Sequence, residues 1–512
     1  MEKELKFEFA ADQDAAVRDL ATVLHLQDHA TSEHALDSEY FDTPEYLLHR
    51  CGAALRVRRE GGRMVQTLKS AGDRKGAQFE REEYETPLAG DNPDLAALQA
   101  SVPKSSSLAK LLRTPGLQEQ LRPVFRTTVT RKVWSLETGG GETFELALDT
   151  GRVIAGEHDR PFSELELELK QGIGTHLPEI GLQLVERLPL RLSMQSKSER
   201  GYDLLVTPQR RAVTAGAVTL KKRDTVEAAF CKIVRNCLAQ VHANAPLVSA
   251  GNSPEGVHQM RVGLRRFRSA LDMFADALAL PDGLADEVKW MADELGQARD
   301  WQVLAHATLP GVDADRDNRD HVSQAEAAAA SIAASRHADA ARAVQSPRYA
   351  RLMLALEHWL ATAAWRGTAD EARKKLLKTR IGAHARHVLR TRHRKLMRRG
   401  RGLHKLDTHH RHRARIAAKK LRYAAEFFAD LFERKSLKPY RRVLSSLQDD
   451  LGWGNDMAVA DGLLTELERH HRKVAAGASY ARGFLAARLG HDRENQRKLW
   501  KRFRSTARPE AI

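Results

Sequence analysis

The stretch SELELELK at residues 163–170 alternates three glutamates with three leucines. Strict alternation of this kind indicates a β-strand, because successive side chains of a strand point to opposite faces. Glu164, Glu166 and Glu168 then share one face. Like charges at neighbouring positions repel one another, and each carboxylate resists leaving water. The segment therefore predicts either a solvated strand face or a buried face with cations placed among the carboxylates.

The start of the chain favours the buried alternative. MEKELKFEF at residues 1–9 places Glu2, Glu4 and Lys6 on one side of a second strand and Leu5, Phe7 and Phe9 on the other. Later segments repeat this division, with inward candidates Arg56 and Arg58; Arg81, Glu83 and Glu85; Glu145 and Asp149. If the apolar sides pack under helices, expected at 12–26, 107–112 and 179–186, the charged sides converge inside a closed or nearly closed antiparallel barrel.

Length and charge predict two domains with different partners. The 512 residues exceed what one hydrophobic core usually serves. Residues 1–205 carry 26 Lys and Arg against 34 Asp and Glu, a net charge of −8, whereas the remainder carries +24. The basic part suggests a polyanionic ligand. We expect a cytoplasmic protein without a membrane segment, because charges crowd the N-terminus and the three cysteines have no zinc spacing.

The chain divides into an α+β barrel domain at 1–205, a linker at 206–222 and an all-α domain at 223–505. The helical part contains a repeat. HQMRVGLRRFRSALDMF at 258–274 aligns without gaps on HRARIAAKKLRYAAEFF at 412–428, and DELGQARDWQV at 293–303 aligns on DDLGWGNDMAV at 449–459. We therefore expect two helical bundles related by a pseudo-twofold axis.

Each copy of the repeat predicts a basic helix face beside an apolar one. His258, Arg261, Arg265 and Arg268 fall on one face of the first helix by their spacing. The second copy places His412, Arg415, Lys419 and Arg422 in the same way. A solvated Lys/Arg face is the ordinary explanation of such a pattern, but here the pattern is duplicated with its histidine and lacks interspersed acids.

A barrel lined by carboxylates and cations suits a ligand with both requirements. Carboxylates bind a hard divalent cation such as Mg²⁺, whereas Arg and Lys bind phosphate oxygens. A polyphosphorylated substrate with a bridging metal matches that inventory and favours in-line phosphoryl transfer. No P-loop, GxGxxG or HExxH motif occurs in the chain.

Residues 1–205 resemble the CYTH domains, or triphosphate tunnel metalloenzymes. Glu2-x-Glu4-x-Lys6 looks like their ExExK signature, and YFDTPEYLLHRCGAALRVRRE at 40–60, QTLKS, FELALDTG, ELELELK and SKSERGY match in order. The resemblance implies an eight-stranded antiparallel tunnel that binds a triphosphate, with Mg²⁺ or Mn²⁺ on carboxylates. It implies catalytic roles for Glu2, Glu4, Lys6, Glu166 and Glu168, and metal ligation by Glu2, Glu4, Glu83, Asp149, Glu166 and Glu168.

The same resemblance implies which cations hold phosphate: Lys6, Arg56, Arg58, Lys69, Arg81, Arg126, Arg131, Lys197 and Arg200. Within that set Arg126 and Arg131 lie on opposite strand faces, so at most one points inward unless a bulge intervenes. The attacking water could be activated by the metal, a carboxylate or a lysine, and the sequence does not decide which.

The helical half resembles the CHAD domain, and the stretch H-x-x-R-[VI]-x-x-[RK]-[RK] in both copies carries the match. The resemblance implies binding of long-chain inorganic polyphosphate between two bundles, by His258, Arg261, Arg265, Arg266, Arg268, His412, Arg415, Lys419, Lys420 and Arg422. Basic helices do not by themselves distinguish polyphosphate from RNA or DNA. Nucleic acid is the less favoured ligand, because the basic faces offer few exposed aromatics for stacking.

Together the two halves resemble bacterial inorganic triphosphatases of the CYTH-CHAD type. The function expected from this resemblance is metal-dependent hydrolysis of inorganic triphosphate to pyrophosphate and phosphate, with polyphosphate bound by the helices. Two alternatives stay open. The barrel could act on an organic triphosphate, as an adenylate cyclase or thiamine triphosphatase, or the chain could be a noncatalytic polyphosphate-binding protein.

Overall fold

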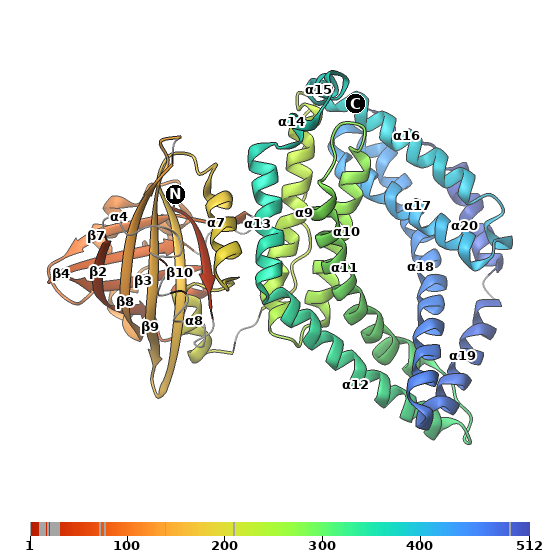
Figure 1. Cartoon of the computed structure of the whole chain (residues 1–512), viewed down its shortest axis with the longest axis horizontal. Helices are drawn as coiled ribbons and strands as arrows, with labels where there is room; N and C mark the ends of the chain where they lie inside the picture. Colours follow the sequence, from red (N-terminus) through yellow and green to blue (C-terminus); the bar gives the residue numbers. More distant parts are fainter. Residues whose placement is uncertain are drawn as a thin grey trace. The chain divides into compact units, whose positions relative to one another are not determined.

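The structure of the chain is a computed structural model that describes residues 2–9, 17, 20, 31–70, 73–75, 78–138, 140–207, 210–490 and 493–511 (Figure 1). The chain forms two compact units. Unit 1 contains Met1–Arg211 together with Val344–Ala363, and unit 2 contains Ala212–Ala343 together with Ala364–Ile512. A short segment from the middle of the helical half thus belongs to the barrel unit.

Unit 1 is built on one antiparallel sheet in the order β5-β6-β1-β10-β9-β8-β2-β3-β4-β7, with β11 also pairing with β1. Its strands are β1 (Glu2–Glu8), β2 (Thr31–Asp42), β3 (Ala53–Glu60), β4 (Arg63–Ser70), β5 (Asp73–Lys75), β6 (Gln78–Arg81), β7 (Glu83–Leu88), β8 (Arg122–Glu137), β9 (Thr143–Ala155), β10 (His158–Gln171) and β11 (Arg191–Leu192).

The sheet curls into a nearly closed barrel because one bent strand joins its two edges. β6 pairs with β1, whereas β7, only one residue further along, pairs with β4. Counting β6 and β7 as one strand, the circuit has eight strands, as expected. The helices of this unit are α3 (Leu47–Arg50), α4 (Leu95–Ser101), α5 (Ser107–Leu111), α6 (Leu117–Gln120), α7 (Leu177–Arg187), α8 (Lys197–Leu205) and α13 (Pro347–Thr362).

The alternation of charged and apolar residues in 2–8 and 163–170 decides which face of β1 and β10 is apolar. Leu5, Phe7, Leu165 and Leu167 are completely buried on the outer side of the sheet. Helix α7 covers β1 so closely that a Cβ atom on Gly181 would lie 2.6 Å from Leu5 Cδ1. Helix α13 packs in turn on α7. The apolar strand faces are therefore covered, and the charged faces are left for the interior.

The helices expected at 107–112 and 179–186 are present as α5 and α7. The helix expected at 12–26 lies outside the described residues except for Val17 and Leu20, both of which are fully buried. Helix α8 closes on the barrel through Gly201, where a Cβ atom would lie 2.2 Å from the Phe125 ring. This close approach places the first residues of α8 at the barrel wall.

The regular secondary structure of unit 2 is helical within its described residues, apart from two isolated β-bridges, as expected. Its elements are α9 (Val226–Ser249), α10 (Pro254–Met273), α11 (Asp282–Val303), η2 (Leu304–Thr308), η3 (Leu309–Gly311), α12 (Arg319–Val344), α14 (Trp365–Thr368), α15 (Glu371–Lys378), α16 (Ile381–Arg399), η4 (Leu403–Lys405), α17 (Thr408–Phe427), η5 (Ala429–Leu431), α18 (Arg434–His470), η6 (Arg472–Val474), α19 (Ala475–Gly490) and α20 (Arg493–Ser505). None of the described helices combines the length and apolar character needed to cross a bilayer.

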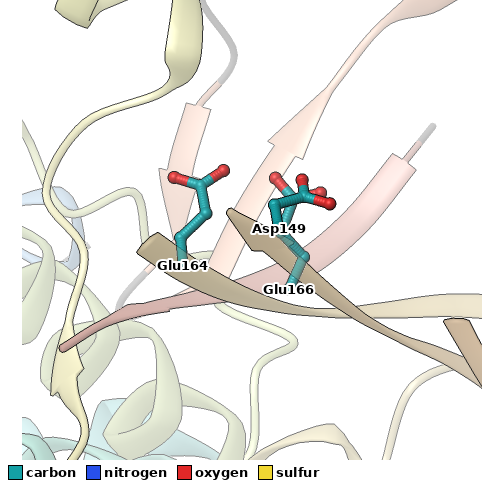
Figure 2. Close-up of side chains that lie close together, drawn as sticks. All are labelled: Asp149, Glu164 and Glu166. Atoms are coloured by element: carbon teal, nitrogen blue, oxygen red, sulfur yellow. The ribbon is translucent and has the colours of Figure 1, made fainter. Parts of the chain in front are cut away.

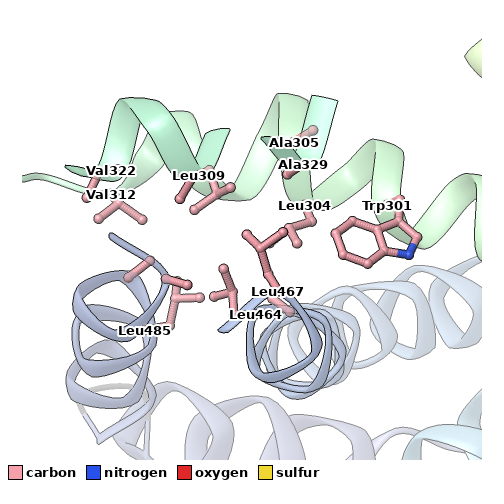
Figure 3. Packing of buried hydrophobic residues seen from close by; sticks show 14 of the residues in the cluster. Trp301, Leu304, Ala305, Leu309, Val312, Val322, Ala329, Leu464, Leu467 and Leu485 are labelled. Carbon is pink, nitrogen blue, oxygen red and sulfur yellow. The ribbon is translucent and has the colours of Figure 1, made fainter. Parts of the chain in front are cut away.

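The repeat seen in the sequence corresponds to two helix pairs, α10 with α11 and α17 with α18. An apolar cluster ties the far ends of the two copies together (Figure 3). Trp301, Leu304 and Leu309 come from the first copy, and Leu464 and Leu467 come from the second. This shared core lies next to the region in which the basic helix faces of the two copies meet.

Candidate functional site

The barrel encloses a cavity of about 360 Å³ that is lined mainly by charged side chains; we call it the barrel cavity. Its cationic residues are Lys6, Arg56, Arg58, Lys69, Arg81, Arg131, Lys170 and Lys197. Its acidic residues are Glu2, Glu4, Glu60, Glu83, Glu85, Glu145, Glu166 and Glu168. The inward direction of the charged strand faces, inferred from parity, is therefore observed.

The cations among the glutamates of β10 come from neighbouring elements of the same barrel. Antiparallel pairing of β1 with β10 sets Lys6 opposite Glu166 and Glu4 opposite Glu168. Lys6 Nζ forms ion pairs with Glu166 and, at 3.1 Å, with Glu4 Oε2. Burial alone would lower the pKa of Lys6, but the carboxylates of Glu166 and Glu4 outweigh it and raise that pKa. Lys6 is thus a permanently charged part of the wall.

Two further cations hold the carboxylates of β9 and β10 together. Arg131 Nη2 donates to Asp149 Oδ2 at 2.6 Å and to Glu166 Oε2 at 2.5 Å. Lys197 Nζ lies 2.7 Å from Asp149 Oδ2 and also pairs with Glu164. Lys197 is the first residue of α8, whose start is fixed by a capping box between Ser196 and Glu199. The helix cap therefore positions a cation in the barrel.

Asp149, Glu164 and Glu166 form the one acidic group within the described residues whose oxygens lie close enough together to hold a metal ion (Figure 2). Burial raises the pKa of Glu164. Burial would also raise the pKa of Glu166, but Lys197, Lys6 and Arg131 hold it well below its usual range. Glu164 Oε2 is buried without a hydrogen-bond partner. This oxygen lies 3.7 Å from Arg200 Nη2, and together with the other hard carboxylate ligands it fits a divalent cation such as Mg²⁺ or Mn²⁺.

This group overlaps only partly with the expected metal ligands. Asp149 and Glu166 were expected, whereas Glu164 was seen on the strand face but given no role. Glu2, Glu4, Glu83 and Glu168 line the barrel cavity outside the group. Burial, together with repulsion from Glu2 and Glu4, raises the pKa of Glu168 against the opposing effect of Lys170. A second crowded set of carboxylates therefore lies where β1 faces the end of β10.

The ion pairs of β1 continue onto β4, β6 and β7. Arg81 bridges Glu2 Oε2 at 2.5 Å and Glu4 Oε1 at 2.6 Å. Lys69 Nζ lies 2.8 Å from Glu83 Oε1 and 3.3 Å from Glu2 Oε1. Burial and the neighbouring guanidinium of Arg81 lower the pKa of Lys69 to about 8, against the opposing effect of Glu2. These two cations are thus paired with three carboxylates.

Arg58 is the cation of the barrel cavity with the least compensation. Its Nε lies 3.4 Å from Ser38 Oγ, and no described acidic side chain comes within ion-pair distance of it. Burial and the positive charges of Arg56 and Arg131 lower the pKa of Arg58 to about 10. Arg56 donates to Thr67 Oγ1 at 3.1 Å and lies 3.7 Å from Glu85. These two guanidinium groups therefore offer donors to an anion.

Two expected phosphate ligands lie elsewhere. Arg126 is exposed on the outer face of β8, while Arg131 points inward, which settles the alternative that strand parity left open. Arg200 lies behind the wall, where its Nη2 donates to Glu8 Oε2 at 2.9 Å and to Ser193 Oγ at 3.2 Å. Lys170, which does line the barrel cavity, was missed, although it continues the alternation of 164, 166 and 168.

In unit 2 the two copies of the repeat face a second cavity of about 700 Å³, between α10, α11, α17 and α18; we call it the central cavity. Its basic residues are His258, Arg261, Arg265, Arg299, Arg415, Lys419 and Arg422. Three of the four residues of each predicted basic face therefore converge on this cavity. Burial and the charges of Arg265, Arg415 and Arg261 lower the pKa of Lys419 to about 7.

Each copy also places one aspartate against the first arginine that the two copies share in the alignment. Arg261 Nη2 lies 3.6 Å from Asp300 Oδ1, and Arg415 Nη2 lies 3.3 Å from Asp456 Oδ1. These aspartates occupy equivalent positions in the aligned segments 293–303 and 449–459. Their equivalence is visible in the aligned sequence, but no role was predicted for them. The pairs orient the two arginines and leave Arg265 and Lys419 in positive surroundings.

Four residues expected to bind polyphosphate do not line the central cavity. Arg266 is only 2% exposed, where it donates to Asn236 and Gln240 and pairs with Glu426 at 3.0 Å. Lys420 pairs with Asp272 at 3.1 Å, and the exposed side chains of Arg268 and His412 are outside the lining. In RRFR at 265–268 the helix turn separates adjacent arginines onto different faces.

Comparison with known proteins gives both halves a relationship. The CYTH domain model matches residues 1–202, and the CHAD domain model matches residues 232–465. An inorganic triphosphatase of Haemophilus influenzae is 33% identical over 172 residues, which are 33% of this chain and 45% of that protein. An uncharacterized protein of Mycobacterium tuberculosis is 27% identical over 304 residues, 56% of this chain and 54% of that protein. The chain thus spans about half the length of these curated relatives.

Among solved structures, the CHAD domain from the plant Ricinus communis is 34% identical, with a TM-score of 0.54. The alignment covers 59% of this chain and 99% of the plant protein. The alignment thus spans nearly the whole of that domain.

Proposed function

Because the chain carries a CYTH domain and belongs to the CHAD family, we propose that its barrel hydrolyses inorganic triphosphate to pyrophosphate and phosphate in a metal-dependent reaction, and that its helical unit binds polyphosphate. Each proposed function corresponds to one of the two charged cavities. The barrel cavity lies within unit 1, and the central cavity lies within unit 2.

The observation that carries the barrel proposal is the pair of neighbouring guanidinium groups, Arg58 without an ion pair and Arg56 with one at 3.7 Å to Glu85, inside a cavity that also holds a crowded set of carboxylates. A phosphate chain placed against these guanidinium groups receives charge-assisted hydrogen bonds. Lys69 and Arg81, held by Glu2 and Glu83, extend the cationic wall. The wall would bind the phosphate chain and fix its orientation for in-line attack.

The carboxylates opposite this wall supply the metal requirement. Glu166 with Asp149 and Glu164 would hold Mg²⁺ or Mn²⁺. Such an ion would supply positive charge against the phosphate oxygens and would make a bound water more acidic. Lys6, Lys197 and Arg131 keep Glu166 ionised and fixed in place. The protein thus provides binding, orientation and electrostatic stabilisation.

The polar lining of the barrel cavity favours an inorganic phosphate chain as the substrate. The wall of the barrel cavity is lined mostly by polar surface, and the aromatic side chain that reaches it, Tyr40, is stacked on Phe125 with ring centroids 4.4 Å apart. A nucleobase or thiazolium ring would need an apolar or aromatic platform. We therefore favour inorganic triphosphatase activity over adenylate cyclase and thiamine triphosphatase activity.

For unit 2, the observation that carries the proposal is the convergence of both basic faces on the central cavity. Its cations outnumber its acids, which are Asp300, Asp449 and Asp456. A flexible chain of phosphates can follow such a wall without any base recognition. One aromatic side chain, Trp453, lines the central cavity. This composition favours polyphosphate over single-stranded RNA, which gains much of its affinity from stacking on aromatic rings.

The first test is phosphate release from inorganic triphosphate, ATP and thiamine triphosphate at equal concentration, with and without Mg²⁺ or Mn²⁺. We expect fast, metal-dependent release with a preference for inorganic triphosphate. Release from none of them by folded protein would leave a noncatalytic binding protein. Preference for ATP or thiamine triphosphate would move the substrate assignment to that compound.

The second test is competition between long-chain polyphosphate and RNA in a filter-binding assay at equal phosphate concentration. We expect polyphosphate to displace RNA. Displacement in the opposite direction would assign the central cavity to nucleic acid.

A further inference from the structure

A second basic cavity, of about 780 Å³, lies in unit 2 beside the start of α18; we call it the lateral cavity. Its cationic residues are Arg422, Arg434, Lys438, Arg441 and Arg442. They come from α17 and from the first three turns of α18. Its four residues on α18 belong neither to the repeat nor to the two predicted basic helix faces.

These four cations have no acid to neutralise them. Within the described part of the chain, no ion pair joins Arg434, Lys438, Arg441 or Arg442 to a carboxylate. The acidic residue that lines the lateral cavity, Asp430, accepts the backbone N–H of Leu220 at Oδ2, 3.1 Å away. The lateral cavity therefore has five cations and one carboxylate, a charge balance suited to an anion with several charges.

The lateral cavity continues the central cavity along one face of α18. Arg422 lines both cavities, and its Nε donates to Gln448 Oε1 at 2.7 Å. On α18 the lateral lining runs through Lys438, Arg441, Arg442 and Ser445, and the central lining continues through Gln448, Asp449, Gly452 and Asp456. Spacings of three and four keep all of these residues on one helix face.

The first copy of the repeat has no counterpart to this basic face. Helix α11, which corresponds to α18, begins with Asp282 and carries Asp286 and Glu287 in its first two turns. Acidic residues at the start of a helix oppose binding of an anion there. The two copies are thus equivalent at the central cavity and opposite in charge at the start of the second helix.

We infer that a long phosphate chain bound in the central cavity leaves it on one side only, past Arg422 and along α18 into the lateral cavity. This inference rests on the proposed polyphosphate binding by unit 2. From Gln448 to Arg434 the helix rises about 21 Å, at 1.5 Å per residue. A short oligophosphate fills the central cavity alone, whereas a longer chain also contacts Lys438, Arg441 and Arg442.

The test compares binding of short-chain and long-chain inorganic polyphosphate, each of defined size range, to the full-length protein. The lateral variant carries Lys438→Gln, Arg441→Gln and Arg442→Gln. A control variant carries Lys374→Gln, Lys375→Gln and Lys378→Gln on α15, where all three side chains are exposed outside both cavities. Both variants lose three positive charges, and glutamine keeps a high helix propensity. A third variant, Arg265→Gln with Lys419→Gln, weakens the central cavity itself.

We expect the lateral variant to lose about tenfold or more in affinity for the long chain and little for the short chain. Its long-chain affinity should also depend less steeply on salt. The control should keep both affinities, and the central variant should lose both. Equal long-chain affinity in the lateral variant and the control overturns the inference, while loss in the central variant still supports the proposed function. Absence of binding by the unmodified protein would instead overturn the polyphosphate proposal.

Discussion

The barrel cavity and the central cavity use the same side chains but balance charge differently. In the barrel, eight cations face eight carboxylates, and most of them form buried ion pairs across strands. In the central cavity, two Arg–Asp pairs are surrounded by further cations. A balanced wall can accept an anion and a metal cation together, whereas a wall with excess positive charge accepts only the anion. The difference separates a site suited to chemistry from one suited to binding.

The largest effect that would break this comparison is expected at Glu166. Changing Glu166 to Gln removes the carboxylate shared by Lys6, Lys197 and Arg131. We expect turnover of inorganic triphosphate to fall on the order of 10²-fold or more. Binding of long-chain polyphosphate by unit 2 should be retained. Steady-state phosphate release measures the first, and filter binding measures the second.

The matched control for Glu166→Gln is Glu33→Gln, an equal change at an exposed position on the outer side of β2. It should leave turnover unchanged. Full turnover in the Glu166→Gln variant would show that Glu166 is not one of the catalytic residues.

A second change asks whether every arginine of the repeat belongs to the binding wall. Arg266→Met removes the buried guanidinium that joins Asn236, Gln240 and Glu426. Leaving these partners unsatisfied should lower the free energy of unfolding by about 2 to 3 kcal/mol. Polyphosphate affinity of the folded protein should stay the same. Denaturant unfolding measures the stability, and binding at low temperature measures the polyphosphate affinity of the folded protein. A loss of affinity without a loss of stability would show that Arg266 is a binding residue.

Arg58 and Arg126 provide a matched pair within the barrel. Arg58→Gln removes the least compensated cation of the barrel cavity, and we expect KM for inorganic triphosphate to rise about tenfold or more. Arg126→Gln makes the same change on the outer face. It should leave both KM and kcat unchanged. The comparison of initial rates over substrate concentration tests the inward and outward directions of the two side chains.

The smallest effect concerns the pH dependence of polyphosphate binding. Lys419, with a pKa of about 7, faces Arg261 and Arg265 of α10, Arg415 of α17 and Asp456 of α18. The first three stay cationic, and His258 has a pKa lowered by burial and by Arg299, so it stays neutral at pH 7. A phosphate chain favours the protonated amine. Affinity should therefore fall severalfold as pH rises from 6 to 8.

The variant Lys419→Met tests this assignment, because it removes the group that titrates near neutrality. We expect its affinity to be lower at pH 6 and nearly constant across the same range. A pH dependence as steep as that of the unmodified protein would assign the titration to another group.

Strand parity was the most reliable guide to the site. From alternation alone, Glu2, Glu4, Lys6, Arg56 and Glu166 were assigned to an interior face, and they line the barrel cavity. Strand parity also predicted that Arg126 and Arg131 point to opposite faces of the strand. It could not predict which of the two points inward, because that depends on where β8 pairs with β2 and β9. Cross-strand register, such as Lys6 opposite Glu166, is set by the folded sheet.

The helical site was predicted less completely for a geometric reason. One helix face spans several neighbouring positions, so RRFR and KK runs do not reveal which cation faces the partner helix. Arg265 and Lys419 line the central cavity, whereas their neighbours Arg266 and Lys420 pair with Glu426 and Asp272. The contribution of α18 depends on tertiary packing, which sequence spacing alone did not show.

The placement of α13 has a consequence for protein synthesis. The helix occupies residues 347–362, well inside the segment matched by the CHAD model, yet it packs on α7 of the barrel unit. Domains generally fold in order as the chain leaves the ribosome. Here the outer layer of the first unit is completed only after translation has passed through much of the second. A fragment that stops at the linker would expose the side of α7 that α13 covers, so we expect it to be less stable than the full chain.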